Sequence, residues 1–147
     1  MEVEITRPRN GWVDFVIRHE NFVLSDAISD VPCDFVGEMV SGFRKLLTTG
    51  GQQQFLLGLE PHYYEIIMAE AKCYFSIKIE LVFEHPETKA PELIFETGGT
   101  FSEIILPFFH AIKKFYGDLN DPMDWDWPSC NQCNLDELTL IIERKSD

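Results

Sequence analysis

The sequence predicts a single α+β domain over residues 1–147, with a mainly antiparallel, twisted β-sheet and two amphipathic helices packed on one face. Three observations predict this class. Residues 73–84 alternate apolar and polar side chains, two other stretches repeat apolar residues at helical spacing, and 147 residues with 45% hydrophobic content suffice for one core. The alternating run is expected to be a long strand, with one face buried and the other mostly polar.

The N-terminal segment is expected to form a β-hairpin. Residues 2–6 alternate apolar and acidic side chains, and Asn10-Gly11, a pair that tolerates positive φ, lies in the turn that follows. The second strand, 12–17, has apolar residues too dense for clean alternation, which predicts a central strand or one covered on both faces. For residues 22–26, a third short strand and the lead-in to a helix both fit.

A first helix is predicted from residue 31 by apolar residues three and four positions apart. Asp30 is the expected N-cap, Pro32 would lie in the first turn, where its missing N–H costs nothing, and Gly50 and Gly51 end the helix. The apolar stripe consists of Val31, Phe35, Val36, Met39, Val40, Phe43, Leu46 and Leu47.

Further strands are predicted over residues 52–60, 62–69 and 93–95. The segment 62–69 alternates in the manner of a strand within a meander, although its Glu, Met and Ala residues make a helix a competing interpretation. Two prolines punctuate residues 85–91, which indicates a polar loop.

A second helix is predicted over the apolar stripe of residues 104–115, with Gly117 as its stop. Thr100 followed by Glu103 suits a capping box, which favours a start at Thr100. Pro107 conflicts with that start, because a proline inside a helix removes one hydrogen bond and clashes with the preceding turn. The helix therefore either starts at Thr100 and is kinked, or begins at Pro107.

The C-terminal part is predicted to contain an irregular, acidic and Trp-rich segment over residues 118–134. After it, apolar residues alternate over 138–142, which predicts a last short strand or a terminal helix turn.

The charge balance excludes several classes of partner. The chain has 12 basic and 25 acidic residues, a net charge of −13, which repels nucleic acid and anionic lipid. The same charge would attract a basic protein, and solubility alone is the competing interpretation. No apolar run approaches the roughly 20 residues of a membrane span, and the first residues lack the pattern of a signal peptide. We therefore expect a cytoplasmic protein whose four cysteines are free thiols.

Cys130 and Cys133 form a CxxC pair, which can supply half of a tetrahedral zinc site or a redox pair. Neither a second such pair nor a pair of histidines occurs in the 14 residues that follow. They are therefore weak metal candidates, and we expect a binding protein with no catalytic residues and no cofactor.

The acidic and aromatic loop around the two tryptophans has the composition of a contact surface, because aromatic residues supply binding energy and acids steer a basic partner. In the competing interpretation, one or both indoles fold back onto the sheet edge. The candidate binding residues are Asp121, Asp124, Trp125, Asp126 and Trp127.

The pattern of several elements resembles a family of small bacterial proteins that are similar to immunity proteins of polymorphic and contact-dependent toxin systems. The resemblance spans roughly residues 12–116 and is carried by Ser25-Asp26 and Asp30 before the first helix, by Glu60-Pro61 with Tyr63 or Tyr64 after it, and by the late helix. It implies an antitoxin-like protein that binds a basic toxin domain and blocks its active surface.

Two other functions fit the sequence. One is a small metal- or thiol-dependent enzyme that uses Cys130 and Cys133, and the other is a homodimeric structural module joined through an exposed sheet face.

Overall fold

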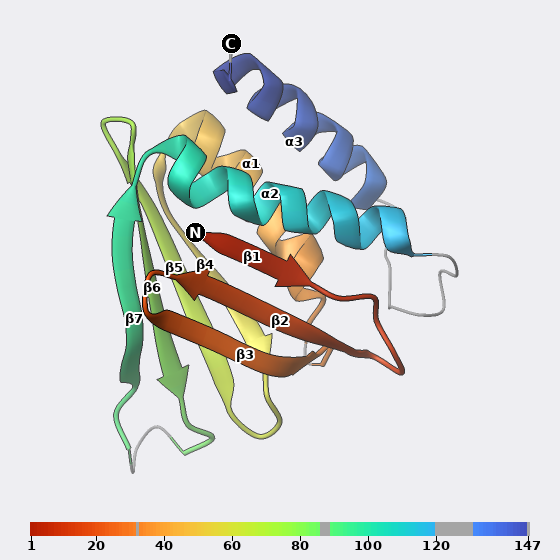
Figure 1. The fold of residues 1–147 in the computed structure, drawn as a ribbon, viewed down its shortest axis with the longest axis vertical. Helices are drawn as coiled ribbons and strands as arrows, with labels where there is room; N and C mark the ends of the chain where they lie inside the picture. The colour runs from red at the N-terminus through yellow and green to blue at the C-terminus, as the bar shows by residue number, and fades with distance from the viewer. Residues whose placement is uncertain (32, 86–88, 120–130, 147) are drawn as a thin grey trace.

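The computed structural model of the protein describes residues 1–31, 33–85, 89–119 and 131–146, and within them it confirms the predicted α+β class. Seven strands form one antiparallel sheet in chain order, and three helices pack with it (Figure 1). The strands are β1 (Glu2–Ile5), β2 (Trp12–His19), β3 (Phe22–Ser29), β4 (Gly51–Gly58), β5 (Tyr63–Ala71), β6 (Tyr74–Val82) and β7 (Glu92–Gly99). The helices are α1 (Phe35–Thr49), α2 (Phe101–Asp118) and α3 (Asn131–Ser146).

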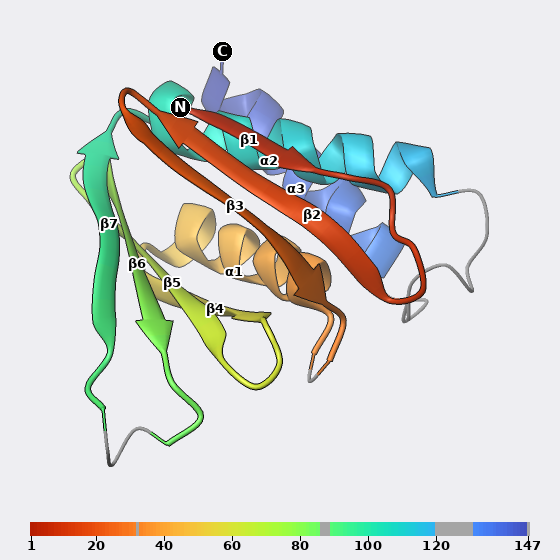
Figure 2. The ribbon, with the colours of Figure 1, turned by 60° about the horizontal axis from the view of Figure 1, so that its bottom comes forward.

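The sheet has two parts that are joined at one point. Strands β1–β3 pair with each other and strands β4–β7 pair with each other, whereas β3 and β4 share only the bridge between Ser29 and Gly58. Figure 2 shows the two parts diverging from this point. The split gives the sheet two separate outer surfaces.

Side chains from β3 close the seam between the two parts. Phe22 stacks on Phe95 of β7 with ring centroids 4.1 Å apart, although β3 and β7 are four positions apart in the strand order. The Tyr64 hydroxyl donates to the Asp26 carboxylate at 2.6 Å, and the Ser29 hydroxyl donates to Glu60 at 2.6 Å. The sheet is therefore curled, so that β3 contacts both edge strands of the second part, β4 and β7.

The helices lie on one side of the curled sheet and form the core with it (Figures 1 and 2). Helix α1 contacts β4, α2 contacts β1, β6 and β7, and α3 packs on α1. The largest fully buried side chains are six phenylalanines, Phe15, Phe35, Phe43, Phe55, Phe108 and Phe115. Burial of this apolar area is the main force that holds the layers together.

The predicted strands are present. Residues 73–84 contain β6, whose side chains alternate between the core and the outer side as far as Ile79. There the register with β7 shifts, because Ile79 pairs with Phe95 and Glu80 with Leu93, which leaves Ile94 as an extra residue. Residues 62–69 form a strand rather than the competing helix.

The second strand, β2, is central, since it lies between β1 and β3. It is not covered on both faces, because Trp12, Asp14 and Arg18 on its outer side are exposed. Residues 22–26 belong to β3 and do not lead into a helix.

The predicted start of α1 at residue 31 is wrong. Asp34, not Asp30, caps the helix, with its carboxylate accepting the Gly37 N–H at 3.1 Å. The Val31 N–H instead donates to the Ser29 hydroxyl at 3.1 Å, which ties this residue to the end of β3. The predicted end is confirmed, because Gly50 has φ 69° and its N–H donates to the Leu46 carbonyl at 3.0 Å.

Helix α2 starts after Thr100 and continues through Pro107, so the alternative start at Pro107 is wrong. The Glu103 carboxylate accepts hydrogen bonds from the Thr100 N–H and from its hydroxyl, both at 2.8 Å. These bonds, the backbone one first, lower the pKa of Glu103. Anchoring of the first turn fixes the helix start on the N-terminal side of the proline.

The C-terminal part contains a full helix, α3, where the sequence predicted a last short strand or a terminal helix turn. Residues 131–134 start α3 and Asp118 ends α2, so the predicted irregular segment is wrong at both of its ends. Of the two alternatives predicted for residues 138–142, the last strand is wrong and the helical one is confirmed, although the helix is longer than one turn.

Candidate functional site

The predicted binding residues cannot be placed by the structure. Asp121, Asp124, Trp125, Asp126 and Trp127 lie outside the described residues, as does Cys130. Cys133 is described and lies exposed in the first turn of α3. Whether Cys130 and Cys133 act together, and whether the tryptophans form a contact surface, therefore stay predictions.

Potential metal ligands are dispersed across the part of the chain that the structure describes. Within that part, no three His, Cys, Asp or Glu residues are gathered closely enough to hold a metal ion. Cys33 is half-buried beside the main chain of Leu56, with its sulfur 3.9 Å from the carbonyl oxygen. Burial, followed by the nearby Glu38 carboxylate, raises the pKa of the Cys33 thiol to about 11.

This raised pKa predicts an unreactive Cys33. The fraction of a thiol present as thiolate falls about tenfold for each unit by which its pKa exceeds the pH. Alkylation of Cys33 at pH 8 is therefore expected to be on the order of 100-fold slower than alkylation of a thiol with the usual pKa of 9.0. Iodoacetamide labelling followed by peptide mass spectrometry should find the exposed Cys73 labelled well before Cys33. The rate at Cys33 should rise until the pH passes about 11. The protein unfolded in guanidinium is the control, where the difference should vanish, and early labelling of Cys33 would contradict the prediction.

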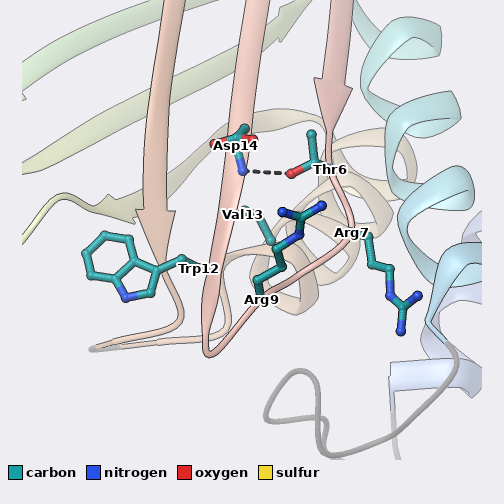
Figure 3. Close-up of a pocket in the computed structure, with 6 residues that line it drawn as sticks. All are labelled: Thr6, Arg7, Arg9, Trp12, Val13 and Asp14. Carbon is teal, nitrogen blue, oxygen red and sulfur yellow. Dashed lines mark hydrogen bonds between the residues drawn. The ribbon is translucent and has the colours of Figure 1, made fainter.

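A hollow at the β1–β2 connection contains two arginines but does not form a converging site. The Thr6 hydroxyl oxygen accepts the Asp14 N–H at 2.8 Å and fixes the connection. Figure 3 shows Arg7 and Trp12 pointing away from each other on opposite sides of the hairpin, with Arg9 between them. The hollow, about 350 Å³ in volume, is lined by Thr6, Arg7, Arg9, Trp12, Val13 and Asp14.

The strands carry an excess of acidic residues that the helices lack. The three helices contain six acidic and six basic residues, whereas the seven strands contain nine acidic and two basic residues. Charged side chains must point out of the core, so the strands carry this excess on the surfaces that the helices leave open. Both parts of the sheet are therefore acidic, whereas the helices are neutral.

The outer face is defined here as the surface of β4–β7 that points away from the helices. It contains three carboxylates around one ammonium group. Lys78 contacts Glu80 with 2.7 Å between nitrogen and oxygen, and this hydrogen bond raises the pKa of Lys78, with Glu96 and Glu65 adding to the effect. Glu65 lies directly opposite Glu80 in the register of β5 and β6.

The opposition of Glu65 and Glu80 is unfavourable for folding, because like charges directly across a strand pair repel each other. The repulsion is partly relieved, since the Gln54 amide donates to Glu65 and Lys78 donates to Glu80. Acids placed at a cost in stability are candidates for a role in binding.

Large apolar side chains also lie on the outer face. Tyr74 is 54% exposed and its ring lies against Gly98, where an added Cβ would approach the hydroxyl oxygen to 2.6 Å. Leu93 is 53% exposed, and Tyr63 is half-buried at the other end of the face. Exposed aromatic and large apolar side chains are enriched at protein contact surfaces, and the carboxylates beside them can steer a basic partner.

A cavity of about 570 Å³ lies at the end of the outer face, where the β4–β5 loop meets the segment after β3. The loop contains the cis peptide bond between Glu60 and Pro61, and the Leu59 N–H donates to the His62 carbonyl at 2.8 Å across it. The lining residues are Val31, Leu56, Gly58, Glu60, Pro61, His62 and Tyr63. Leu56 and Tyr63 belong to the outer face, so the cavity and the face form one continuous surface.

Part of this site is visible in the sequence. The alternation in residues 73–84 places Lys78 and Glu80 together on the polar side of one strand. The cavity is not visible, because Val31 and Glu60 are 29 positions apart and meet only through the junction of β3 and β4.

No helix in the described ranges is both long enough and apolar enough to cross a membrane. Comparisons with models of protein families, with curated proteins and with solved structures found no match to the chain. The function is therefore inferred from the chemistry of the outer face and its cavity.

Proposed function

We propose that the protein is an immunity protein, antitoxin-like in action, that binds a basic toxin domain through the outer face and blocks the active surface of that domain. The observation that carries the proposal is the cluster of Glu65, Glu80 and Glu96 around a single lysine, on a sheet surface that the helices leave open. The exposed Tyr74 and Leu93 beside this cluster supply apolar contact area.

The electrostatics of this surface suit fast capture of a basic partner. Complementary charge raises the association rate over that of neutral surfaces, by an amount that falls with ionic strength. Buried aromatic contacts then slow dissociation, which is where most differences in affinity arise. A protein that must neutralise a toxin soon after it appears needs both properties.

Binding to the product of the reading frame next to its gene tests the proposal. The triple variant Glu65→Gln, Glu80→Gln and Glu96→Gln removes the charges that attract the partner, and it is expected to lose about 10- to 100-fold in affinity by titration calorimetry. Each factor of ten in affinity corresponds to about 1.4 kcal/mol of binding free energy. The loss should come mainly from a slower association rate at low salt, and it should shrink when the salt concentration is raised.

A second triple variant provides the control. Glu2→Gln, Glu4→Gln and Glu143→Gln change the net charge equally at exposed positions on β1 and α3, outside β4–β7, and should keep most of the affinity. Equal losses in the two variants would show that only net charge matters. A neighbouring product that is no toxin and does not bind would overturn the proposal, as would a dimer, seen by sedimentation, that buries the outer face.

A further inference from the structure

We propose that the cavity at the end of the outer face receives an arginine side chain of the basic partner, with its guanidinium paired to Glu60 and its aliphatic stem on the apolar wall. The identity of the partner rests on the proposed function, whereas the chemistry of the cavity does not. The proposal makes this cavity the anchor point of the interface.

The wall of the cavity suits an aliphatic stem. Leu56, Pro61 and Tyr63 present two aliphatic side chains and an aromatic ring, and the volume of about 570 Å³ exceeds what one side chain requires. Long charged side chains bury their methylene groups against apolar surface and keep the charged head at a polar group. An entering side chain with an apolar stem and a charged head therefore matches this wall.

Glu60 supplies the polar group, and it is held in place. Its Oε1 accepts the Ser29 hydroxyl at 2.6 Å, and Ser29 is itself 2% exposed. Its backbone lies in the left-handed region with φ 42°, which is costly for a residue with a side chain. Its second oxygen, Oε2, accepts no hydrogen bond from the described residues and stays able to bind a donor.

The charge of the cavity favours a cation rather than an anion. Among the described residues that line it there is no lysine or arginine, so within them the charge of Glu60 has no cationic neighbour. The His62 Nδ1 accepts the Glu84 N–H at 3.2 Å, so the neutral ring carries its proton on Nε2. The hydrogen-bonded ring is thus fixed in orientation, and Glu60 is the one carboxylate among the described residues of the wall.

Arginine fits better than lysine for two physical reasons. A guanidinium is more weakly hydrated than an ammonium, so entering a mostly apolar cavity costs it less. It also binds a carboxylate through two parallel N–H donors and stacks on an aromatic ring such as that of Tyr63.

Titration with a short peptide tests the inference without any toxin. The blocked tripeptide acetyl-Gly-Arg-Gly-amide should cause saturable shifts of the backbone amide signals of Leu56, Gly58 and Tyr63 in NMR spectra. The same peptide with citrulline, lysine or norleucine in the middle should bind at least tenfold more weakly. Glu60→Gln should weaken arginine binding at least tenfold, and Glu70→Gln, an equal charge change at the other end of β5, should leave it unchanged.

Three outcomes would overturn the inference. They are no saturable shift with the arginine peptide, equal binding of the citrulline, lysine or norleucine peptide, and full binding by the Glu60→Gln variant. Thermal unfolding of Glu60→Gln and of Ser29→Ala shows whether loss of the bond between these two residues disrupts the folded cavity. A Glu60→Gln variant that stays folded and does not bind the arginine peptide has lost binding and not the cavity. Because no toxin enters this experiment, it can fail while capture by the outer face succeeds, and the reverse also holds.

Discussion

Replacing Leu138 with alanine is expected to lower the free energy of unfolding by about 2–5 kcal/mol, whereas the same change at Leu140 should cost less than about 0.5 kcal/mol. Leu138 is 0% exposed and belongs to the core, while Leu140, two residues further along α3, is 52% exposed. Urea denaturation, followed by far-UV circular dichroism, measures both values. Leu140→Ala is the matched control, because chain position and side-chain chemistry are nearly the same.

This pair of variants also separates the two secondary structures that the sequence allows for residues 138–142. In a strand, Leu138, Leu140 and Ile142 share one face and would be buried together. In a helix, Leu135, Leu138 and Ile142 share a face and Leu140 points away, which is the arrangement in the structure. Similar costs at Leu138 and Leu140 would contradict the helix.

The sequence predicted most elements because their patterns are regular over many residues. In β6 alternate residues are buried from Phe75 to Ile79, and in α1 and α2 buried residues recur at three and four positions over whole helices. The five residues 138–142 are too few to distinguish a period of two from one of 3.6. Leu135, which completes the helical pattern with Leu138 and Ile142, lies within the segment predicted as irregular. The helical period was therefore not visible.

The predicted start of α1 is wrong because two residues could perform the same role. Asp30 and Asp34 can both cap a helix, and the choice between them depends on Ser29, whose hydroxyl binds the Val31 N–H and draws residue 31 toward β3. That hydroxyl is placed by its bond to Glu60, 31 positions along the chain. Local propensity cannot report such a distant contact.

The candidate surface could be predicted only in part. The polar face of β6 follows from its alternation, but the neighbours that make it acidic, Glu65 and Glu96, depend on the register with β5 and β7. The β-bulge between Ile79 and Glu80 alters that register. The cavity depends on the split between β3 and β4, which no local pattern indicates.

Replacing Gly42 with alanine is expected to destabilise the protein by about 1–3 kcal/mol, although alanine favours helices more than glycine does. Gly42 is buried in the middle of α1, and a Cβ there would lie 2.2 Å from Cε1 and 2.8 Å from Cζ of Phe55. The Phe55 ring is 1% exposed and packs on Phe43 with centroids 5.6 Å apart, so it has little room to retreat. The gain in helix propensity, about 1 kcal/mol, is smaller than this packing cost.

Gly117→Ala provides the matched control with the opposite sign. A Cβ at Gly117, near the end of α2, meets nothing within 4 Å, so the change should stabilise the protein by up to about 1 kcal/mol. Both variants can be compared with the parent by urea denaturation at equal protein concentration. Because the substitution is the same at both sites, a difference in sign can come only from the surroundings. An equal increase in the free energy of unfolding for both variants would show that α1 does not pack closely on β4.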